Sequence, residues 1–135
     1  MTFSGHCLCR AVTYIVDTAS PLVVYCHCDD CQRNTGSTYA LILTVPKHTV
    51  HIQGPLRTFS NVGSSGLAVH RSFCGVCGSP ISDVAESAPE EISIKGGSLE
   101  PECKRWLQPS EELWTASKLS FCQERLPQSH LHMPE

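Results

Sequence analysis

The sequence predicts a mainly β domain, and three observations lead to that prediction. Short runs rich in β-branched and aromatic residues recur along the chain, with turn residues between them at close intervals. Seven of the nine cysteines stand in tight pairs or triplets. The chain of 135 residues is long enough for one compact domain with a real core and too short to divide comfortably into two. We therefore expect one domain of antiparallel strands over residues 1–127 and a polar tail over residues 128–135.

The first expected strands lead to a cysteine triplet. Residues 11–16 (AVTYIV) are enriched in residues that favour strands, and the run ends at the turn of residues 17–21. Residues 22–25 form a second expected strand that continues directly into the triplet. The polar segment 29–34 is expected to form one helical turn, which the glycine at position 36 would close.

The most apolar run predicts the central strand. This run covers residues 39–45 (YALILTV), and Pro46 stops it. Residues 53–55 (QGP) lie between two further expected strands and predict a hairpin or a tight turn. A helical turn is expected within residues 109–114. The remaining expected strands are residues 50–52, 56–59, 67–73, 81–84 and 92–95.

Composition and charge exclude several classes of partner. The formal net charge is −3, and no run of lysine or arginine could neutralise phosphates, so nucleic acid and anionic membrane surfaces are not expected as partners. No apolar run approaches the roughly 20 residues of a transmembrane helix. Residues 1–10 already hold polar groups and two cysteines, unlike a secretory signal. With an odd number of cysteines, we expect a reducing, cytoplasmic environment and metal binding rather than a disulfide framework.

The first and last cysteine clusters predict a closed metal site. Cys74 and Cys77 form a CxxC motif with glycine at its second and fifth positions, which is the composition of a tight knuckle whose backbone N–H groups point toward the thiolates. Cys7 and Cys9 form a CxC motif near the amino terminus. The four thiolates are the complete set for a tetrahedral structural zinc ion, which would stabilise the fold. The alternative is two redox-active pairs, but the chain lacks the βαβ pattern of thioredoxin-like sites.

The middle cluster, Cys26, Cys28 and Cys31, predicts an open metal site. It has no obvious fourth protein ligand, and three protein ligands plus an exchangeable position are the pattern of catalytic zinc. Alternatively, Cys103 or Cys122 closes the triplet as a fourth ligand and makes it a second structural site. The sequence therefore predicts two zinc ions per chain, one structural and one catalytic.

Polar residues near the triplet are candidates for proton transfer. His27 lies between two of the cysteines and, in an extended segment, points away from them, which favours a supporting or surface position over ligation. Asp29 and Asp30 are candidate proton carriers, with solvated loop residues as the alternative interpretation. His130 and His132 have a spacing compatible with metal binding, but a mobile terminus is the simpler interpretation.

The cysteine motifs together resemble the glutathione-dependent formaldehyde-activating enzyme family, whose relatives include centromere protein V. The resemblance rests on a CxC motif, then CHCxxC followed by Thr-Gly, then FCxxCGSP, and it runs over about residues 5–126. All seven clustered cysteines match in order. Arg10 departs from the glycine that is common in the family after the first motif.

The resemblance implies an Mss4-like β-tent fold with two zinc sites. The activity that it implies is condensation of formaldehyde with glutathione to S-hydroxymethylglutathione, which is classed as a carbon–sulfur lyase for its reverse direction. The implied ligands are Cys7, Cys9, Cys74 and Cys77 for the structural zinc, and Cys26, Cys28 and Cys31 for the catalytic zinc.

These expectations lead to a zinc-dependent carbon–sulfur lyase or synthase that acts on an adduct of glutathione or of another small thiol. Three thiolate ligands make the ion electron-rich, which favours holding a nucleophilic thiolate over activating water. Arg33, Thr35 and Ser37 are candidates to contact the carboxylates of the thiol substrate, with a solvated surface charge as the alternative for Arg33.

Two other functions stay open from the sequence. One is a lyase or addition enzyme of specialised metabolism that uses the same zinc on a different electrophile. The other is a non-catalytic zinc module that binds another protein. The exposed strand edges expected of a small β domain are also compatible with a homodimer.

Overall fold

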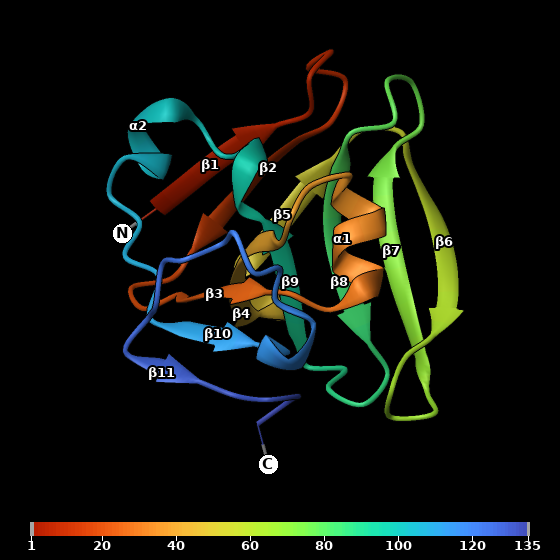
Figure 1. Cartoon of the computed structure of the whole chain (residues 1–135). Helices are drawn as coiled ribbons and strands as arrows, with labels where there is room; N and C mark the ends of the chain where they lie inside the picture. The colour runs from red at the N-terminus through yellow and green to blue at the C-terminus, as the bar shows by residue number, and fades with distance from the viewer. Residues whose placement is uncertain (1, 135) are drawn as a thin grey trace.

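The computed structural model describes residues 2–134, which form two β-sheets with two short α-helices (Figure 1). The three-stranded sheet has the order β1-β2-β5, and the eight-stranded sheet has the order β11-β10-β3-β4-β9-β8-β7-β6. The strands are β1 (Thr2–His6), β2 (Thr13–Asp17), β3 (Leu22–Cys26), β4 (Ala40–Pro46), β5 (Val50–Gln53), β6 (Leu56–Val62), β7 (Ala68–Cys74), β8 (Pro80–Ala85), β9 (Glu91–Lys95), β10 (Glu111–Leu113) and β11 (Gln128–Ser129). The helices are α1 (Asp29–Thr35) and α2 (Pro101–Lys104), and short 3₁₀ turns lie at Lys47–Thr49, Gly96–Ser98 and Thr115–Ser117.

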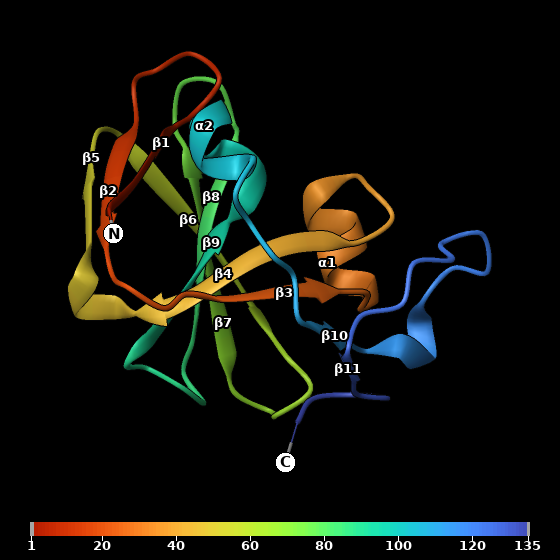
Figure 2. The same ribbon diagram turned by 90° about the vertical axis from the view of Figure 1, so that its left-hand side faces the viewer.

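The prediction of a mainly β, mostly antiparallel fold is confirmed. Only β10 and β11 pair in parallel among the described strands, β10 with β3 and β11 with β10. Figure 2 shows the small sheet on one side of the molecule, with α1, β10 and β11 on the other. No helix within residues 2–134 has the length and apolarity needed to cross a membrane.

Strand β4 is central in the large sheet, as its apolar sequence predicts. It pairs antiparallel with β3 on one side and with β9 on the other. Leu43 and Val45 join the main core between the sheets, whereas Ala40 and Ile42 pack on the opposite face beside the cysteine triplet. A strand that is buried on both faces needs a continuous apolar run rather than an alternating one.

The two sheets share the main core and are joined by a tight turn at residues 53–55. We expected a hairpin or a tight turn here, and a hairpin is wrong because β5 pairs with β2 while β6 pairs with β7. Gly54 has φ +119°, and a Cβ at this position would lie 2.3 Å from the carbonyl oxygen of Ala11. The close approach of the two chain segments therefore requires glycine.

The carboxyl-terminal part of the chain differs from the sequence-based expectation. Residues within 109–114 form strand β10 rather than a helical turn, because the segment pairs with the edge of β3. The expected tail from residue 128 contributes β11, and the backbone N–H of Trp114 donates to the carbonyl oxygen of His132. Residues 128–132 are therefore hydrogen-bonded to the domain.

Candidate metal centres and adjoining cavities

The four cysteines of the first and last motifs lie together at the junction of the two sheets. Their sulfur atoms all lie within 4.8 Å of one another, and all four are free thiols. Cys7 Sγ lies 3.6 Å from Cys9 Sγ, and Cys9 Sγ lies 3.8 Å from Cys74 Sγ. Tetrahedral zinc with Zn–S bonds of about 2.3 Å holds its sulfur atoms roughly 3.8 Å apart. The group therefore fits a structural zinc ion, which these four residues would hold.

Backbone N–H groups prepare this closed site for negative charge. The N–H of Val12 donates to Cys7 Sγ at 3.2 Å, and the N–H groups of Val76 and Cys77 donate to Cys74 Sγ at 3.3 and 3.4 Å. Such donors offset the charge of a thiolate, as in other cysteine knuckles. The local spacing of each motif thus produces the geometry that the sequence predicts.

Ser79 connects the two cysteine motifs of the closed site. Its hydroxyl oxygen lies 3.1 Å from Cys77 Sγ and accepts a hydrogen bond from the backbone N–H of Leu8 at 3.2 Å. The hydrogen bond from the Ser79 hydroxyl lowers the pKa of Cys77 to about 5, which favours the thiolate that binds metal.

Arg10 adopts a backbone conformation that favours glycine. Its φ is +69°, in the left-handed region, where a side chain carries a steric cost. The turn that follows Cys9 requires this conformation, and the backbone N–H of Arg10 donates to the carbonyl oxygen of Cys7. The departure from glycine at this position is therefore a source of local strain in the turn of the closed site.

The middle cysteine triplet is built by the end of β3 and the start of α1. Cys26 is the last residue of β3, Cys28 caps the helix, and Cys31 lies in its first turns. Cys28 Sγ accepts a hydrogen bond from the backbone N–H of Cys31 at 3.2 Å and lies 3.5 Å from Cys26 Sγ. The predicted helical turn is confirmed, and Gly36 ends it in the left-handed conformation with φ 69°.

The triplet forms a three-sulfur group that can hold a metal ion. Its sulfur atoms lie within 4.8 Å of one another, and within residues 2–134 no fourth histidine, cysteine or carboxylate belongs to the group. Hydrogen bonds from the Cys26 and Cys31 thiols lower the pKa of Cys28 to about 2, and the contact with Cys28 raises the pKa of Cys26. The lowered pKa of Cys28 favours the thiolate form that binds metal, and the soft donors of the group fit zinc.

Neither isolated cysteine joins the triplet. Cys103 packs against the main core, and Cys122 lies in the carboxyl-terminal segment beside Lys118. The alternative in which one of them completes a four-cysteine site therefore has no support in the geometry of the described residues.

His27 is buried and faces away from the triplet's sulfur atoms. Only 1% of it is exposed, and its Nε2 donates to Glu112 Oε1 at 2.9 Å. Glu112 also accepts from Lys118 Nζ at 2.6 Å and from the backbone N–H of Leu126 at 3.0 Å. Gln32 donates from its amide to the carbonyl oxygen of His27. His27 therefore anchors the triplet segment to the carboxyl-terminal part of the chain, which sequence reasoning did not identify.

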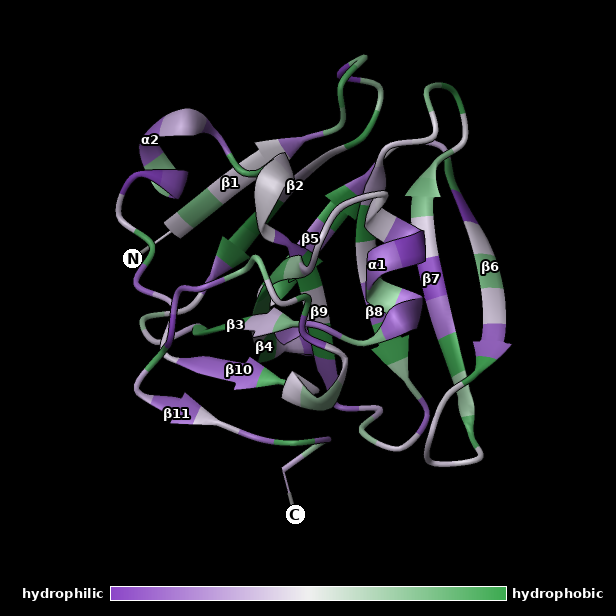
Figure 3. Cartoon of the chain, viewed as in Figure 1, coloured by the Kyte–Doolittle hydropathy of each residue, from purple (hydrophilic) through white to green (hydrophobic). Residues whose placement is uncertain are grey.

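The remaining predicted site residues lie on or after α1, most of whose residues are hydrophilic (Figure 3). Asp29 pairs with Arg33 at 2.7 Å on the exposed side of the helix. Asp30 Oδ2 accepts from the Asn61 side chain at 3.1 Å, and Arg71 Nη2 lies 3.7 Å away. Asp30, Arg33, Asn61 and Arg71, with Asn34 and Phe59, line a surface groove of about 280 Å³, which we call the outer groove.

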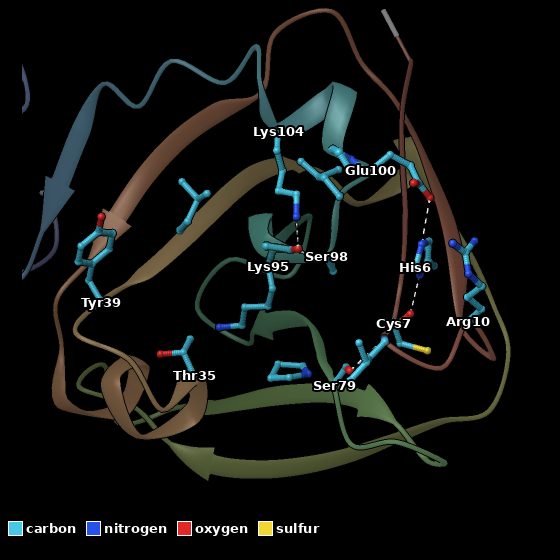
Figure 4. A pocket seen from close by; sticks show the side chains of 16 residues that line it. His6, Cys7, Arg10, Thr35, Tyr39, Ser79, Lys95, Ser98, Glu100 and Lys104 are labelled. Carbon is cyan, nitrogen blue, oxygen red and sulfur yellow. Dashed lines mark hydrogen bonds and ion pairs between the residues drawn. The ribbon is translucent and has the colours of Figure 1, made fainter.

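Thr35 and Ser37 lie apart from the triplet's sulfur atoms. The hydroxyl of Thr35 donates to the carbonyl oxygen of Cys31 at 2.8 Å, and the backbone N–H of Ser37 donates to the Thr35 hydroxyl oxygen. Thr35 lines a cleft of about 730 Å³, the large cleft, whereas Ser37 does not. Figure 4 shows Thr35 and Ser79 in the lower part of the view, Lys104 and Glu100 in the upper part, and Lys95 between them.

A smaller cavity is the one that reaches the triplet. It has a volume of about 220 Å³, lies on the face of the large sheet that carries Ile42, and is lined by Cys26 and Cys31 together with Arg71 and Asp83. We call it the inner cavity. None of the triplet's cysteines lines the large cleft, so the inner cavity is the candidate for chemistry although it is the smaller of the two.

Three buried charges lie beside the triplet. Asp83 Oδ2 accepts from Lys95 Nζ at 2.7 Å and from Arg71 Nη1 at 3.2 Å, and all three residues are more than 90% buried. The charge of Arg71 contributes to the lowered pKa of Cys28, after the larger effect of the Cys26 and Cys31 thiols. Arg71, Asp83 and Lys95 each fall inside a strand that the sequence predicts. Charged residues at such positions could have indicated this cluster, because a charge that is buried in a sheet is rarely without a partner.

The fold and the sites together define the class of protein. It is a mainly β protein with one closed and one open group of cysteines. A model of the family described as "Glutathione-dependent formaldehyde-activating enzyme" matches residues 2–117, and the chain belongs to this family. A search of curated proteins found no match.

Among solved structures, a crystal structure of a Rhodobacter sphaeroides protein from structural genomics is similar in fold. The two are 23% identical with a TM-score of 0.60, over 78% of this chain and 97% of the other.

Proposed function

We propose that this protein is a zinc-dependent carbon–sulfur lyase or synthase that acts on an adduct of glutathione or another small thiol. Family membership supports this class of reaction, with formaldehyde–glutathione condensation as the prototype. The observation that carries the proposal is the three-sulfur group, two of whose cysteines, Cys26 and Cys31, line the inner cavity, and which has no fourth protein ligand among residues 2–134. A bound zinc ion there would supply an exchangeable position for a substrate thiolate.

The residues around the triplet have complementary proposed roles. Cys26, Cys28 and Cys31 would hold the ion, and the positive charge of Arg71, which lines the inner cavity, favours a thiolate or a developing oxyanion there. His27 would act as a positioning residue because its hydrogen bond to Glu112 fixes the segment that carries the ligands.

The outer groove is the proposed docking site for the polar body of the thiol. Arg71 lines both this groove and the inner cavity, so its side chain is shared by the walls of the two. Arg33 lines the groove and already pairs with Asp29, so a substrate carboxylate would share its guanidinium group with Asp29. Of the two candidate aspartates, Asp30 lines the groove and is the proposed proton carrier, whereas Asp29 is occupied by its ion pair with Arg33.

Fewer observations support Thr35 and Ser37 as substrate contacts than support Arg33. The Thr35 hydroxyl is used in a hydrogen bond to the helix backbone, and neither residue lines the inner cavity or the outer groove. We propose that both shape the end of α1 rather than bind the thiol directly.

A Cys28→Ser variant tests the proposal. We expect it to stay folded by circular dichroism, to bind one zinc ion instead of two by elemental analysis, and to lose acceleration of the exchange between formaldehyde, glutathione and their adduct. That exchange is measured by two-dimensional exchange NMR. Cys122→Ser is the matched control, since Cys122 lies outside both cysteine groups, and it should keep both ions and full activity.

Two results would contradict the proposal. The first is a Cys28→Ser protein that retains both zinc ions and wild-type exchange rates. The second is a wild-type protein whose two zinc ions both resist mild chelators, because an open site should exchange its metal faster than a closed one. The second result would favour a non-catalytic zinc module.

A further inference from the structure

Strand β6 leaves one complete edge of the large sheet unpaired. It is the last strand in the sheet order, and Figure 1 shows it at the outer side of the molecule. Its seven residues pair with β7 without a break in register. The features that usually protect such an edge are missing, because the strand has no lysine, no proline and no bulge. The edge is therefore open to a further strand.

The hydrogen bonds at the two ends of the β6–β7 pair show which backbone groups point outward. The N–H of Gly63 donates to the carbonyl oxygen of Leu67 at 2.9 Å, and the N–H of Gly75 donates to the carbonyl oxygen of Pro55 at 2.7 Å. Both bonds continue the register of the two strands, in which every second residue bonds to the partner. The odd-numbered residues of β6 therefore bond to β7. The N–H and C=O groups of the even-numbered residues 58–62 point away from the sheet.

The exposed side chains of β6 suit a second copy of the same strand. Phe59 is 63% exposed and lines the outer groove, on the face of the sheet that carries α1. When two copies of β6 pair antiparallel about a two-fold axis at Phe59, every residue of the strand has a partner, and Thr58 bonds to Ser60 of the other copy. The two Phe59 rings then lie in a non-hydrogen-bonded pair, where side chains approach most closely.

The charges of the two copies are complementary in this register. Arg57 is the one charged residue of β6, and it forms no ion pair within residues 2–134. Pairing about Phe59 places it opposite Asn61 of the other copy. Asn61 donates to Asp30, whose side chain is 48% exposed. Arg57 of one copy therefore comes beside Asp30 of the other, and no like charges of the two strands face each other.

This arrangement also changes the outer groove. Both arginines that line the groove already have carboxylate partners, Arg33 with Asp29 and Arg71 with Asp83. Arg57 from the other copy would add a further cation to the groove, which is the proposed docking site for the polar body of the thiol.

We infer that the protein forms a two-fold symmetric dimer through its β6 edges, which joins the two large sheets and gives each outer groove Arg57 of the other copy. The pairing itself does not depend on the proposed reaction, whereas the contribution of Arg57 to thiol binding rests on the proposed function. One strand edge and one pair of phenylalanine rings make a small interface, so the dimer exchanges with the monomer in the micromolar range.

Sedimentation equilibrium of the zinc-loaded full chain over a range of concentrations gives the first test. The wild type should pass from monomer to dimer as its concentration rises. Ser60→Pro should stay monomeric, because proline removes an outward N–H at the centre of the edge and leaves the bonds to β7 in place. Ser60→Ala is the matched control. It loses the same side-chain contact with His70 but keeps the N–H, so it should dimerise like the wild type.

Two further substitutions test the side-chain contacts. Phe59→Ser should weaken the dimer about tenfold or more, because it removes the aromatic pair at the axis. Arg57→Glu should also weaken the dimer, since it places a negative charge beside Asp30 of the other copy. Arg105→Glu is the control for the charge change and should leave the dimer intact. Arg105 is exposed at the end of α2, which lies on the opposite side of the molecule from β6 (Figure 1).

Disulfide cross-linking tests the register. Phe59→Cys, combined with Cys103→Ser and Cys122→Ser, should give a covalent dimer on mild oxidation, because residues at the two-fold axis come within reach of a disulfide bond. Val62→Cys in the same background is the control. The two copies of this residue lie at opposite ends of the paired strands, so they should not cross-link.

Calorimetry with glutathione tests the contribution of Arg57 to the outer groove. The dimer should bind glutathione about tenfold more tightly than the monomeric Ser60→Pro variant, which is the effect of one charge-assisted hydrogen bond. Equal affinities would overturn this contribution while the dimer stands.

Two results would overturn the dimer. The first is a wild type that stays monomeric at every concentration, which would leave the β6 edge to a strand of a different protein. The second is a Ser60→Pro variant that dimerises as well as Ser60→Ala, which would place the interface elsewhere. Neither result changes the expected loss of exchange activity in Cys28→Ser, so a failure of the proposed function is recognised separately.

Discussion

Replacing Glu112 with glutamine should strongly destabilise the protein. Glu112 is 2% exposed and accepts hydrogen bonds from His27 Nε2, Lys118 Nζ and the backbone N–H of Leu126. Glutamine has the same shape but only one acceptor oxygen, so its NH₂ group must face one of these donors. The substitution also leaves the ammonium group of Lys118 without its counter-ion.

The size of the expected destabilisation follows from the burial of the ion pair between Glu112 and Lys118. Removing one partner of a fully buried ion pair costs about 3–5 kcal/mol. The side chain of Lys118 is 15% exposed, which reduces the penalty, so we expect a loss of about 3 kcal/mol in the free energy of unfolding. For a domain of this size that corresponds to a decrease in Tm of about 10 °C.

The pH dependence of this loss has a defined sign. Burial alone raises the pKa of Glu112, but hydrogen bonds from Lys118, the Leu126 N–H and His27 outweigh it and lower the pKa below 4.5. The carboxylate therefore contributes its full stability above pH 4.5 and loses it as the pH falls through the lowered pKa. The difference between wild type and Glu112→Gln should stay constant from about pH 5.5 to 8.

Urea unfolding at fixed free zinc concentration measures the effect. Glu111→Gln on the same strand is the matched control, because the Glu111 contact with His130 is longer, at 3.4 Å, and should cost less than about 1 kcal/mol. A loss below about 1 kcal/mol for Glu112→Gln would refute the view that this network anchors the triplet segment.

Two further predictions concern the closed site. Arg10→Gly should raise the free energy of unfolding, measured in urea, by about 0.5–1 kcal/mol. Glycine relieves the strain of the positive φ of 69°, and this gain exceeds the stability lost because glycine makes the unfolded chain more flexible. An unchanged or lower stability would contradict the strain argument. Ser79→Ala should raise the pKa of Cys77 from about 5, so zinc is released at a higher pH than in the wild type when a coloured chelator follows an acid titration. Identical release curves would show that the Ser79 hydroxyl does not tune the site. Ser82→Ala is a control on the next strand, since Ser82 does not contact the cysteines.

Much of the fold and both cysteine groups could be predicted because the signals are local. The apolar run of β4 and the Gly36 that ends α1 each act within a few residues. The sequence predicts a turn at residues 53–55, but it does not predict that this turn joins two sheets. The pairing partners of a strand depend on contacts with segments that are distant in sequence. Strand β10 was mistaken for a helical turn because its three residues form a strand only by pairing with β3.

The sequence by itself determined the three cysteine motifs and the resemblance to the family to which the chain belongs, whereas the structure showed that neither Cys103 nor Cys122 joins the triplet. The spacing within CxC and CxxC motifs places sulfur atoms together whatever the rest of the chain does. Only the tertiary structure decided what surrounds the open group. Glu112 is 85 residues from His27, and Asp83 meets Lys95 and Arg71 only through the register of three neighbouring strands. Because each strand side chain points to one face or the other according to that register, no local pattern could place these charges beside the triplet.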